Sequence, residues 1–263
     1  MTLSEVLTSE TNELATQIQV RFDRGVKDGK RLARFDGPYR AASELLSSRF
    51  GLTVGFAGSL VGGFAALTIL TWFGAEAVRK LIGPSVTTLF DAPVVQYVAA
   101  HRIAGLTGVM RAVTTAGNDL YLWIALLTGG TILARLTRSW RPLFLLALAM
   151  LGAMSLNQII KLAVARTRPP SLFWAIPANG WSFPSGNATE SAAVYRTLAY
   201  KFAGTQRRFG VKVLTYAIGI AAPFLIGISR VYLGVHWPTD VVVGWTLGCV
   251  WSAIVLVSSS TVQ

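Results

Sequence analysis

Apolar residues along this chain gather into six segments that are separated by polar stretches. A helix needs about 20 mostly apolar residues to cross a bilayer, and the second and fourth segments are somewhat shorter than that. The pattern predicts an all-α fold, a six-span transmembrane helical bundle. The six segments lie at about 51–73, 120–134, 142–165, 188–203, 211–229 and 240–258.

The region between the first two segments, 74–119, mixes polar and apolar residues and contains Pro84 and Pro93. Because proline breaks long helices, we expect short helices at the membrane interface here. His101 lies in this region with no acidic neighbour at a recognisable spacing. We expect a structural or interfacial role for it.

Residues 1–50 precede the first apolar segment and lack the apolar core and cleavage site of a signal peptide. Leu14, Ile18 and Phe22 are four apart and share one face of a helix that is otherwise rich in Lys and Arg. Two interpretations stay open: an amphipathic segment on the inner leaflet, or a solvated cytoplasmic helix or tail. Residues 51–263 then form the membrane domain.

The distribution of basic residues predicts the orientation in the membrane. Eight Lys and Arg residues lie in the first 50 positions, and the loops after the second and fourth segments are also basic. Since Lys and Arg concentrate on the cytoplasmic side, both termini are expected in the cytoplasm. The loops between segments three and four and between five and six then lie at the extracytoplasmic face of the cytoplasmic membrane. The basic loop residues are Arg135, Arg138, Arg141, Lys201, Arg207, Arg208 and Lys212.

Composition agrees with a membrane protein: 52% of the 263 residues are hydrophobic and 14% are charged. A net charge of +12 is also found in nucleic-acid-binding proteins. Here, however, the basic residues cluster beside apolar spans, where topology and anionic lipid explain them. We therefore predict the bilayer, and no nucleic acid, as a partner. Cys249 is the single cysteine, which excludes an internal disulfide.

The stretch Ser229–Asp240, SRVYLGVHWPTD, carries the strongest chemical signal. Proline is favoured in the first turn of a helix, so a helix that begins at Pro238 would let the Asp240 carboxylate reach back to His236. A histidine held by a carboxylate has a fixed tautomer and suits a nucleophile. Taken alone, this spacing more often marks a histidine that caps a helix. The two motifs upstream favour the nucleophile instead. Arg230 adds a planar fork of donors suited to phosphate oxygens.

The stretch KLAVARTRP, residues 161–169, ends the third apolar segment. Lys161 and Arg168 are seven residues apart, or two helical turns, and so project from nearly the same face. Because a charge inside a bilayer is costly without an anionic partner, this pair is predicted to bind phosphate. Arg166 is not part of the pair and is expected to extend toward lipid headgroups.

The stretch WSFPSGNATE, residues 181–190, opens the fourth apolar segment. Ser185 is expected to cap the helix, and the free N–H groups of a first turn bind phosphate. Gly186 allows the backbone to approach a ligand closely. Asn187 and Glu190 are spaced as in a capping box, and no catalytic role is assigned to Glu190.

These stretches together predict a site for a tetrahedral oxyanion. No cluster of carboxylates or histidines is present in the sequence to hold a metal, so neither a metal nor another cofactor is expected. The predicted phosphate site consists of Lys161, Arg168, Ser185, Gly186 and Arg230.

The three motifs resemble the signature of the type 2 phosphatidic acid phosphatase family, KxxxxxxRP, PSGH and SRxxxxxHxxxD. The resemblance covers about residues 85–258. The second motif departs from the family at one position, where Asn187 replaces a histidine. The positions that match are Lys161, Arg168 and Pro169, then Pro184, Ser185 and Gly186, then Ser229, Arg230, His236 and Asp240.

The resemblance implies a mechanism in which His236 attacks phosphorus to give a phosphohistidine, and Asp240 holds the ring. The family's histidine at position 187 protonates the leaving oxygen, which Asn187 cannot do because it has no titratable proton near neutral pH. The implied activity is metal-independent dephosphorylation of a lipid phosphate or polyprenyl (pyro)phosphate, impaired here by Asn187. Phosphatidic acid, phosphatidylglycerol phosphate and phosphorylated lipid A or polyprenyl-linked sugars are further implied substrates.

Two alternatives stay open for this chain. One is a catalytically inactive lipid-phosphate-binding protein in which position 187 changed naturally. The other is an enzyme inactivated on purpose by replacing the histidine with asparagine. A transporter is disfavoured because no pair of interrupted spans forms an inverted repeat, and a vanadate-dependent haloperoxidase, which shares the signature, is disfavoured by the membrane spans.

Overall fold

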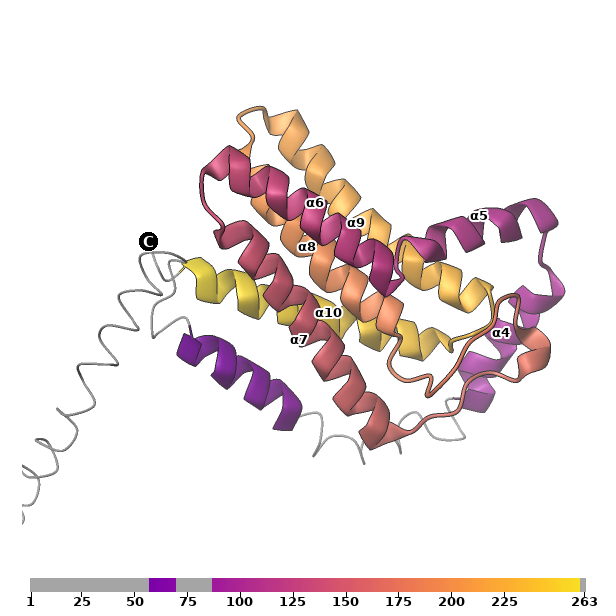
Figure 1. Cartoon of the computed structure of the whole chain (residues 1–263). Helices are drawn as coiled ribbons and strands as arrows, with labels where there is room; N and C mark the ends of the chain where they lie inside the picture. Colours follow the sequence, from indigo (N-terminus) through magenta and orange to yellow (C-terminus); the bar gives the residue numbers. More distant parts are fainter. Residues whose placement is uncertain (1–56, 70–86, 261–263) are drawn as a thin grey trace, which may run out of the picture. The chain divides into compact units, whose positions relative to one another are not determined.

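The computed structural model describes residues 57–69 and 87–260 (Figure 1). The predicted amphipathic segment 1–50 and the two ends of the first predicted span lie outside these residues. Every regular element within the described residues is helical, in agreement with the predicted all-α class.

The order of the helices follows the apolar pattern. A helix at Ala57–Ile69 comes first. The mixed region that follows holds short helices, as its prolines predict. These are η1 (Thr87–Asp91), α4 (Ala92–Ala100) and α5 (Ala104–Thr115). The remaining elements are α6 (Asp119–Thr137), α7 (Arg141–Val164), η2 (Ser171–Phe173), α8 (Gly186–Thr205), α9 (Phe209–Tyr232) and α10 (Pro238–Ser260).

Four of these helices, α6, α7, α9 and α10, are long and apolar enough to cross a membrane. They coincide with four of the six predicted spans. Helix α8 coincides with a fifth and is 20 residues long, but it carries three charged residues, Glu190, Arg196 and Lys201. The count of six spans therefore stays a prediction.

Helix α8 packs against α6, α7, α9 and α10 (Figure 1). Neighbouring helices rather than lipid therefore surround most of its length, which makes its polar side chains tolerable. Towards α6 and α7, its Val194 joins a buried apolar cluster. The other members of this cluster are Leu122, Leu126, Leu133, Leu146 and Met150.

The first turn of α8 lies very close to the middle of α10. A Cβ on Gly248 would collide with the backbone carbonyl of Thr189, so only glycine permits this separation. At the start of α8, the Ser185 N–H donates to the backbone carbonyl of Asp240 (3.0 Å). The second and third sequence motifs are therefore held together by backbone contacts as well as by side chains.

Candidate active site

A cavity of about 840 Å³ opens where α7 ends, α8 begins and the connection from α9 to α10 passes. Most of the predicted site residues line it, although they come from three motifs spread over 80 positions of the sequence. Ser185 and Asp240 lie fully buried beside it. The predicted residues on the cavity wall are Lys161, Arg168, Gly186, Asn187, Arg230 and His236.

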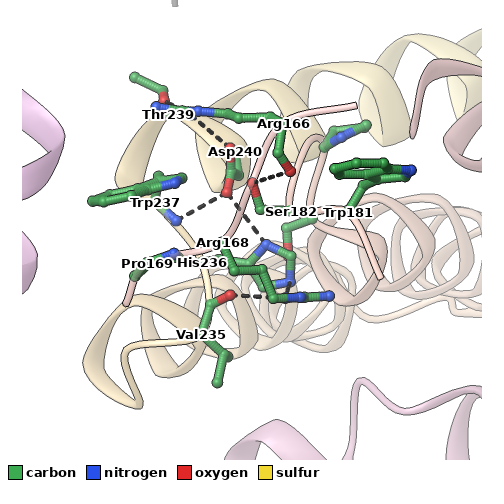
Figure 2. Close-up of polar contacts among 12 residues, drawn as sticks. Arg166, Arg168, Pro169, Trp181, Ser182, Val235, His236, Trp237, Thr239 and Asp240 are labelled. Atoms are coloured by element: carbon green, nitrogen blue, oxygen red, sulfur yellow. Dashed lines mark hydrogen bonds and ion pairs between the residues drawn. The ribbon is translucent and has the colours of Figure 1, made fainter. Parts of the chain in front are cut away.

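One ring nitrogen of His236 lies against Arg168 and the other against Asp240 (Figure 2), and the side chain lines the cavity. Its Nε2 lies 3.0 Å from a guanidinium nitrogen of Arg168. Because arginine only donates hydrogen bonds, Nε2 must carry the lone pair, and the proton is on Nδ1, 3.4 Å from Asp240 Oδ2. Burial lowers the pKa of His236 to about 3. The ring is thus a neutral imidazole whose unprotonated Nε2 accepts a hydrogen bond from Arg168 at the cavity wall, and a nucleophile requires an unprotonated nitrogen.

Asp240 reaches His236 in the manner that the sequence predicts. Helix α10 begins at Pro238, and Asp240 lies in its first turn. Its Oδ2 also accepts a hydrogen bond from the backbone N–H of Trp237 (2.9 Å). Several donors therefore fix the carboxylate, and through it the tautomer of the imidazole.

Arg166 does not extend toward headgroups, and that expectation is wrong. Its guanidinium is 9% exposed and bridges two fully buried carboxylates, Asp240 Oδ1 (2.7 Å) and Asp91 Oδ2 (2.6 Å). Asp91 in turn accepts hydrogen bonds from the Thr239 N–H (3.1 Å) and hydroxyl (2.7 Å). Figure 2 shows Arg166 and Thr239 beside Asp240, on the side away from Arg168.

The sequence contained one signal for this contact that the motif analysis missed. Asp91 is the single charged residue between positions 81 and 100, in an otherwise apolar and uncharged stretch. A lone carboxylate in such a stretch needs a cationic partner. Which cation it finds depends on a contact 75 positions away along the chain, and no local pattern specifies that.

The cations of the phosphate site are held mainly by backbone carbonyl groups. Arg168 donates to Val235 O (2.7 Å), Asn179 O (2.8 Å) and Gly180 O (3.0 Å). Lys161 Nζ donates to Trp181 O (2.9 Å). Since carbonyl oxygens orient these side chains without neutralising them, the positive charge remains available to an anion.

Two buried polar atoms at the phosphate site have no hydrogen-bond partner. These are the Ser185 hydroxyl and Nε of Arg230, a residue that is 8% exposed. Ser185 does occupy the N-cap position of α8, but its side chain makes none of the predicted capping hydrogen bonds. An unpaired buried polar atom costs about 1–3 kcal/mol, and a bound phosphate oxygen would supply acceptors for both groups.

Asn187 faces α6 instead of capping its own helix. Its side-chain amide donates to Asn118 Oδ1 (3.0 Å), so the predicted capping-box pair with Glu190 does not form. Glu190 is 6% exposed and lines the cavity, as does Asp119. No catalytic role was expected for either acid, because Glu190 was considered only as a capping partner and Asp119 belongs to no motif.

His101 lies away from this cavity. Its ring stacks on Tyr97 at 4.2 Å between centroids, and its Nδ1 contacts the Tyr97 carbonyl oxygen at 2.8 Å. These contacts agree with the structural role that was expected for it.

Comparison with known proteins gives consistent results. Residues 142–262 match the model of the PAP2 superfamily. Phosphatidylglycerophosphatase B of Bacillus subtilis is 33% identical over 54% of this chain and 70% of its own length. Undecaprenyl-diphosphatase of Sulfolobus acidocaldarius is 29% identical over 64% of this chain and 78% of its own.

A solved structure shares the fold. The crystal structure of a transmembrane PAP2 type phosphatidylglycerolphosphate phosphatase from Bacillus subtilis superposes with a TM-score of 0.67 and 27% identity, covering 76% of this chain and 97% of that one. The matched region contains all three motifs and the helices that bring them to one cavity. By sequence, by fold and by the arrangement of the motif residues, this chain belongs to the PAP2 superfamily.

Proposed function

We propose that this chain hydrolyses the phosphate ester or anhydride of a membrane lipid through a phosphohistidine at His236, without a metal. The observation that carries the proposal is the neutral His236 ring, whose unprotonated Nε2 lies beside Arg168 at the wall of a cavity that Lys161 and Arg230 also line. The names of the relatives, a phosphatidylglycerophosphatase and an undecaprenyl-diphosphatase, support a lipid phosphate or polyprenyl (pyro)phosphate as the substrate class.

The proposed reaction has two displacements at phosphorus. His236 Nε2 forms a bond to phosphorus while the bond from phosphorus to the leaving oxygen breaks. The Nδ1 proton stays on the ring, where the Asp240 carboxylate stabilises the positive charge that develops. Water then attacks the phosphohistidine, releases phosphate and restores the neutral ring. Lys161, Arg168 and Arg230 stabilise the charge on the phosphoryl oxygens in both steps.

Asn187 predicts a preference among substrates. A monoester expels an alkoxide, which needs a proton in the transition state, and loss of a positioned general acid costs roughly 10²–10⁴ in rate. A lipid pyrophosphate expels a lipid phosphate, which is already stable as an anion near neutral pH. We therefore propose that this chain favours pyrophosphates over monoesters.

The test compares the parent with Asn187→His on a polyprenyl pyrophosphate and on the matching monophosphate. Restoring the histidine should increase monoester turnover far more than pyrophosphate turnover. Equal gains on both substrates would contradict the leaving-group argument and indicate a positioning role for residue 187. A parent that binds lipid phosphate but hydrolyses neither substrate would support the alternative of an inactive binding protein.

We further propose that both termini are cytoplasmic and that the cavity opens at the extracytoplasmic face of the cytoplasmic membrane. Ser171 in η2 belongs to the loop that forms the cavity, whereas Thr205 ends α8. In a Cys249→Ser background, a single cysteine at position 171 should react with an impermeant thiol reagent in intact cells, and one at position 205 should not. Labelling at position 205 but not at 171 would show that the proposed topology is inverted.

A further inference from the structure

The cavity that His236 lines also contains two carboxyl groups, those of Glu190 and Asp119. Glu190 follows Asn187 by three residues and so lies one turn further along α8 on the same face. Its Oε1 lies 3.5 Å from the position that a Cβ on Gly186 would occupy. The carboxyl group therefore folds back toward the first turn of α8, where the phosphate site is, and it lines the same cavity as His236.

The partner of Glu190 comes from α6. Asp119, the first residue of α6, lines the same cavity as Glu190. Two carboxylates that face one cavity repel each other strongly where little water is present, so they are more stable when one of them holds a proton. Adjacent carboxylates share one proton for the same reason in aspartic proteases. The pair thus holds one proton inside the cavity.

Asn187 contributes to this arrangement without titrating. Its amide donates to Asn118 Oδ1 (3.0 Å), the neighbour of Asp119. That hydrogen bond connects the first turn of α8 to the residue that precedes α6 and so keeps Asp119 beside Glu190. The position that holds a histidine in the family therefore supports a different proton donor in this chain.

We propose that Glu190, beside Asp119, protonates the leaving oxygen as a less effective substitute for the family's histidine, so that monoester turnover persists at a reduced rate and the preference for pyrophosphates remains. The proposal rests on the phosphohistidine mechanism proposed above. As His236 Nε2 bonds to phosphorus, the leaving oxygen takes the electron pair of the breaking bond and the proton of the carboxyl pair. In the second step, water attacks phosphorus, the bond to Nε2 breaks, and the pair takes back a proton from that water. The sum is one lipid phosphate and one water converted to one alcohol and one phosphate.

Positive side chains around Glu190 and Asp119 stabilise the pair after it has released its proton. Lys161 interacts electrostatically with Glu190 from α7, and Arg230 from α9 lines the same cavity together with Arg168 and His236. When the pair gives up its proton, these cations stabilise the doubly charged state that remains.

The test measures how the effect of Glu190→Gln depends on the leaving group. Phosphatidic acid expels an alkoxide, whereas p-nitrophenyl phosphate expels a phenolate that is stable near neutral pH. Glu190→Gln should reduce turnover of phosphatidic acid by ~10²-fold or more and reduce turnover of the nitrophenyl ester far less. Asp119→Asn should shift the same ratio in the same direction, and it serves as the second variant if Glu190→Gln does not fold.

Two further arms make the assignment specific. Adding Asn187→His to Glu190→Gln should restore most of the phosphatidic acid turnover, since the family's donor is then back in place. Gln158→Leu alters another polar side chain on the cavity wall and should leave the ratio between the two substrates unchanged.

The outcomes separate the two proposals. If Glu190→Gln slows both esters equally, Glu190 serves to balance the charge of Lys161, and the donor assignment is wrong. A variant that slows neither ester overturns it too. If His236→Ala leaves turnover intact, or if the parent hydrolyses neither ester, then the phosphohistidine mechanism itself is wrong.

Discussion

The two sides of the cavity are built in different ways. On the nucleophile side, His236 and Asp240 meet Arg166 and Asp91, and both carboxylates are fully buried in a set of short contacts. On the leaving-group side, Asn187 departs from the family pattern and is hydrogen-bonded to Asn118. The difference follows from the chemistry: a nucleophile must be held in one orientation and one tautomer, whereas a proton can come from any acid at the right distance. The nucleophile side therefore tolerates less change.

On the nucleophile side, two buried carboxylates depend on one cation for charge compensation. Arg166 is the cation that bridges two carboxylates with no exposed surface. Removing one partner of a buried ion pair leaves an uncompensated charge and costs about 3–5 kcal/mol. Asp91 belongs to η1, outside the region that matches the family model. Part of the support for the nucleophile thus comes from the helices that precede the four long apolar ones.

The largest expected effect comes from removing the nucleophile. His236→Ala should reduce turnover of every lipid phosphate at least ~10⁴-fold, as is typical when an enzyme loses the residue that forms the covalent intermediate. The matched control is His101→Ala, which removes the other histidine of the chain and should retain activity. Turnover by His236→Ala on any substrate at a parental rate would show that the two sides of the cavity do not have the roles described above.

The next largest effect should come from Arg166. Arg166→Met leaves the Asp91 and Asp240 carboxylates without their shared cation, so we expect a loss of about 3–5 kcal/mol in folding stability together with a loss of turnover. Arg207→Ala, an exposed arginine beyond the end of α8, should change neither. The measurements are thermal unfolding in detergent and phosphate release.

A second substitution refines the result for Arg166. Combining Arg166→Met with Asp91→Asn removes one of the two stranded charges, so the double variant should be more stable than Arg166→Met alone. If the two effects simply add, Asp91 and Arg166 are not energetically coupled, and the contribution of Asp91 to the nucleophile side is disproved.

The sequence predicted one of the two contacts that fix the nucleophile side and missed the other. The contact between His236 and Asp240 was predictable because both residues lie in one turn and loop, with Pro238 fixing the start of the helix. The ion pair between Arg166 and Asp91 was not, because it joins residues 75 positions apart. Local spacing determines which face of a helix a side chain occupies, but only packing determines what that face meets.

The same distinction applies to the fold. Five of the predicted spans coincide with the helices α6 to α10, and four of these helices are continuous apolar segments. The central place of α8 was not evident from its composition. Asn118 and Asp119 escaped notice because they lie at the start of α6 and belong to no motif.

A smaller effect, a change in unfolding temperature, should test the phosphate site separately from the nucleophile and the proton donor. Vanadate mimics phosphate, so it should raise the unfolding temperature of the parent through preferential binding to the folded state. Arg168→Ala and Arg230→Ala should each abolish that rise, whereas Glu190→Gln should preserve it, because Glu190 is assigned to the leaving group and not to the phosphate. If both arginine variants respond like the parent, the phosphate site is wrongly assigned.

The smallest expected effect is a pH dependence of stability that belongs to the nucleophile side alone. Burial lowers the pKa of His236 to about 3, and the Asp240 carboxylate offsets only part of that effect. The ordinary pKa of histidine is about 6.5, so below that pH the unfolded chain takes up a proton that the folded chain does not. Folding stability contributed by His236 is therefore present in full above pH ~6.5 and is lost as the pH falls toward 3, by at most about 1.4 kcal/mol per pH unit.

Unfolding temperatures of the parent and of His236→Gln at pH 7 and pH 5 isolate this contribution, since other titrating groups are common to both proteins. The parent should lose more stability between the two values than His236→Gln does. An identical loss in the parent and in His236→Gln would mean that the folded ring takes up a proton as readily as the unfolded chain does, and the claim that burial keeps the ring neutral would be wrong.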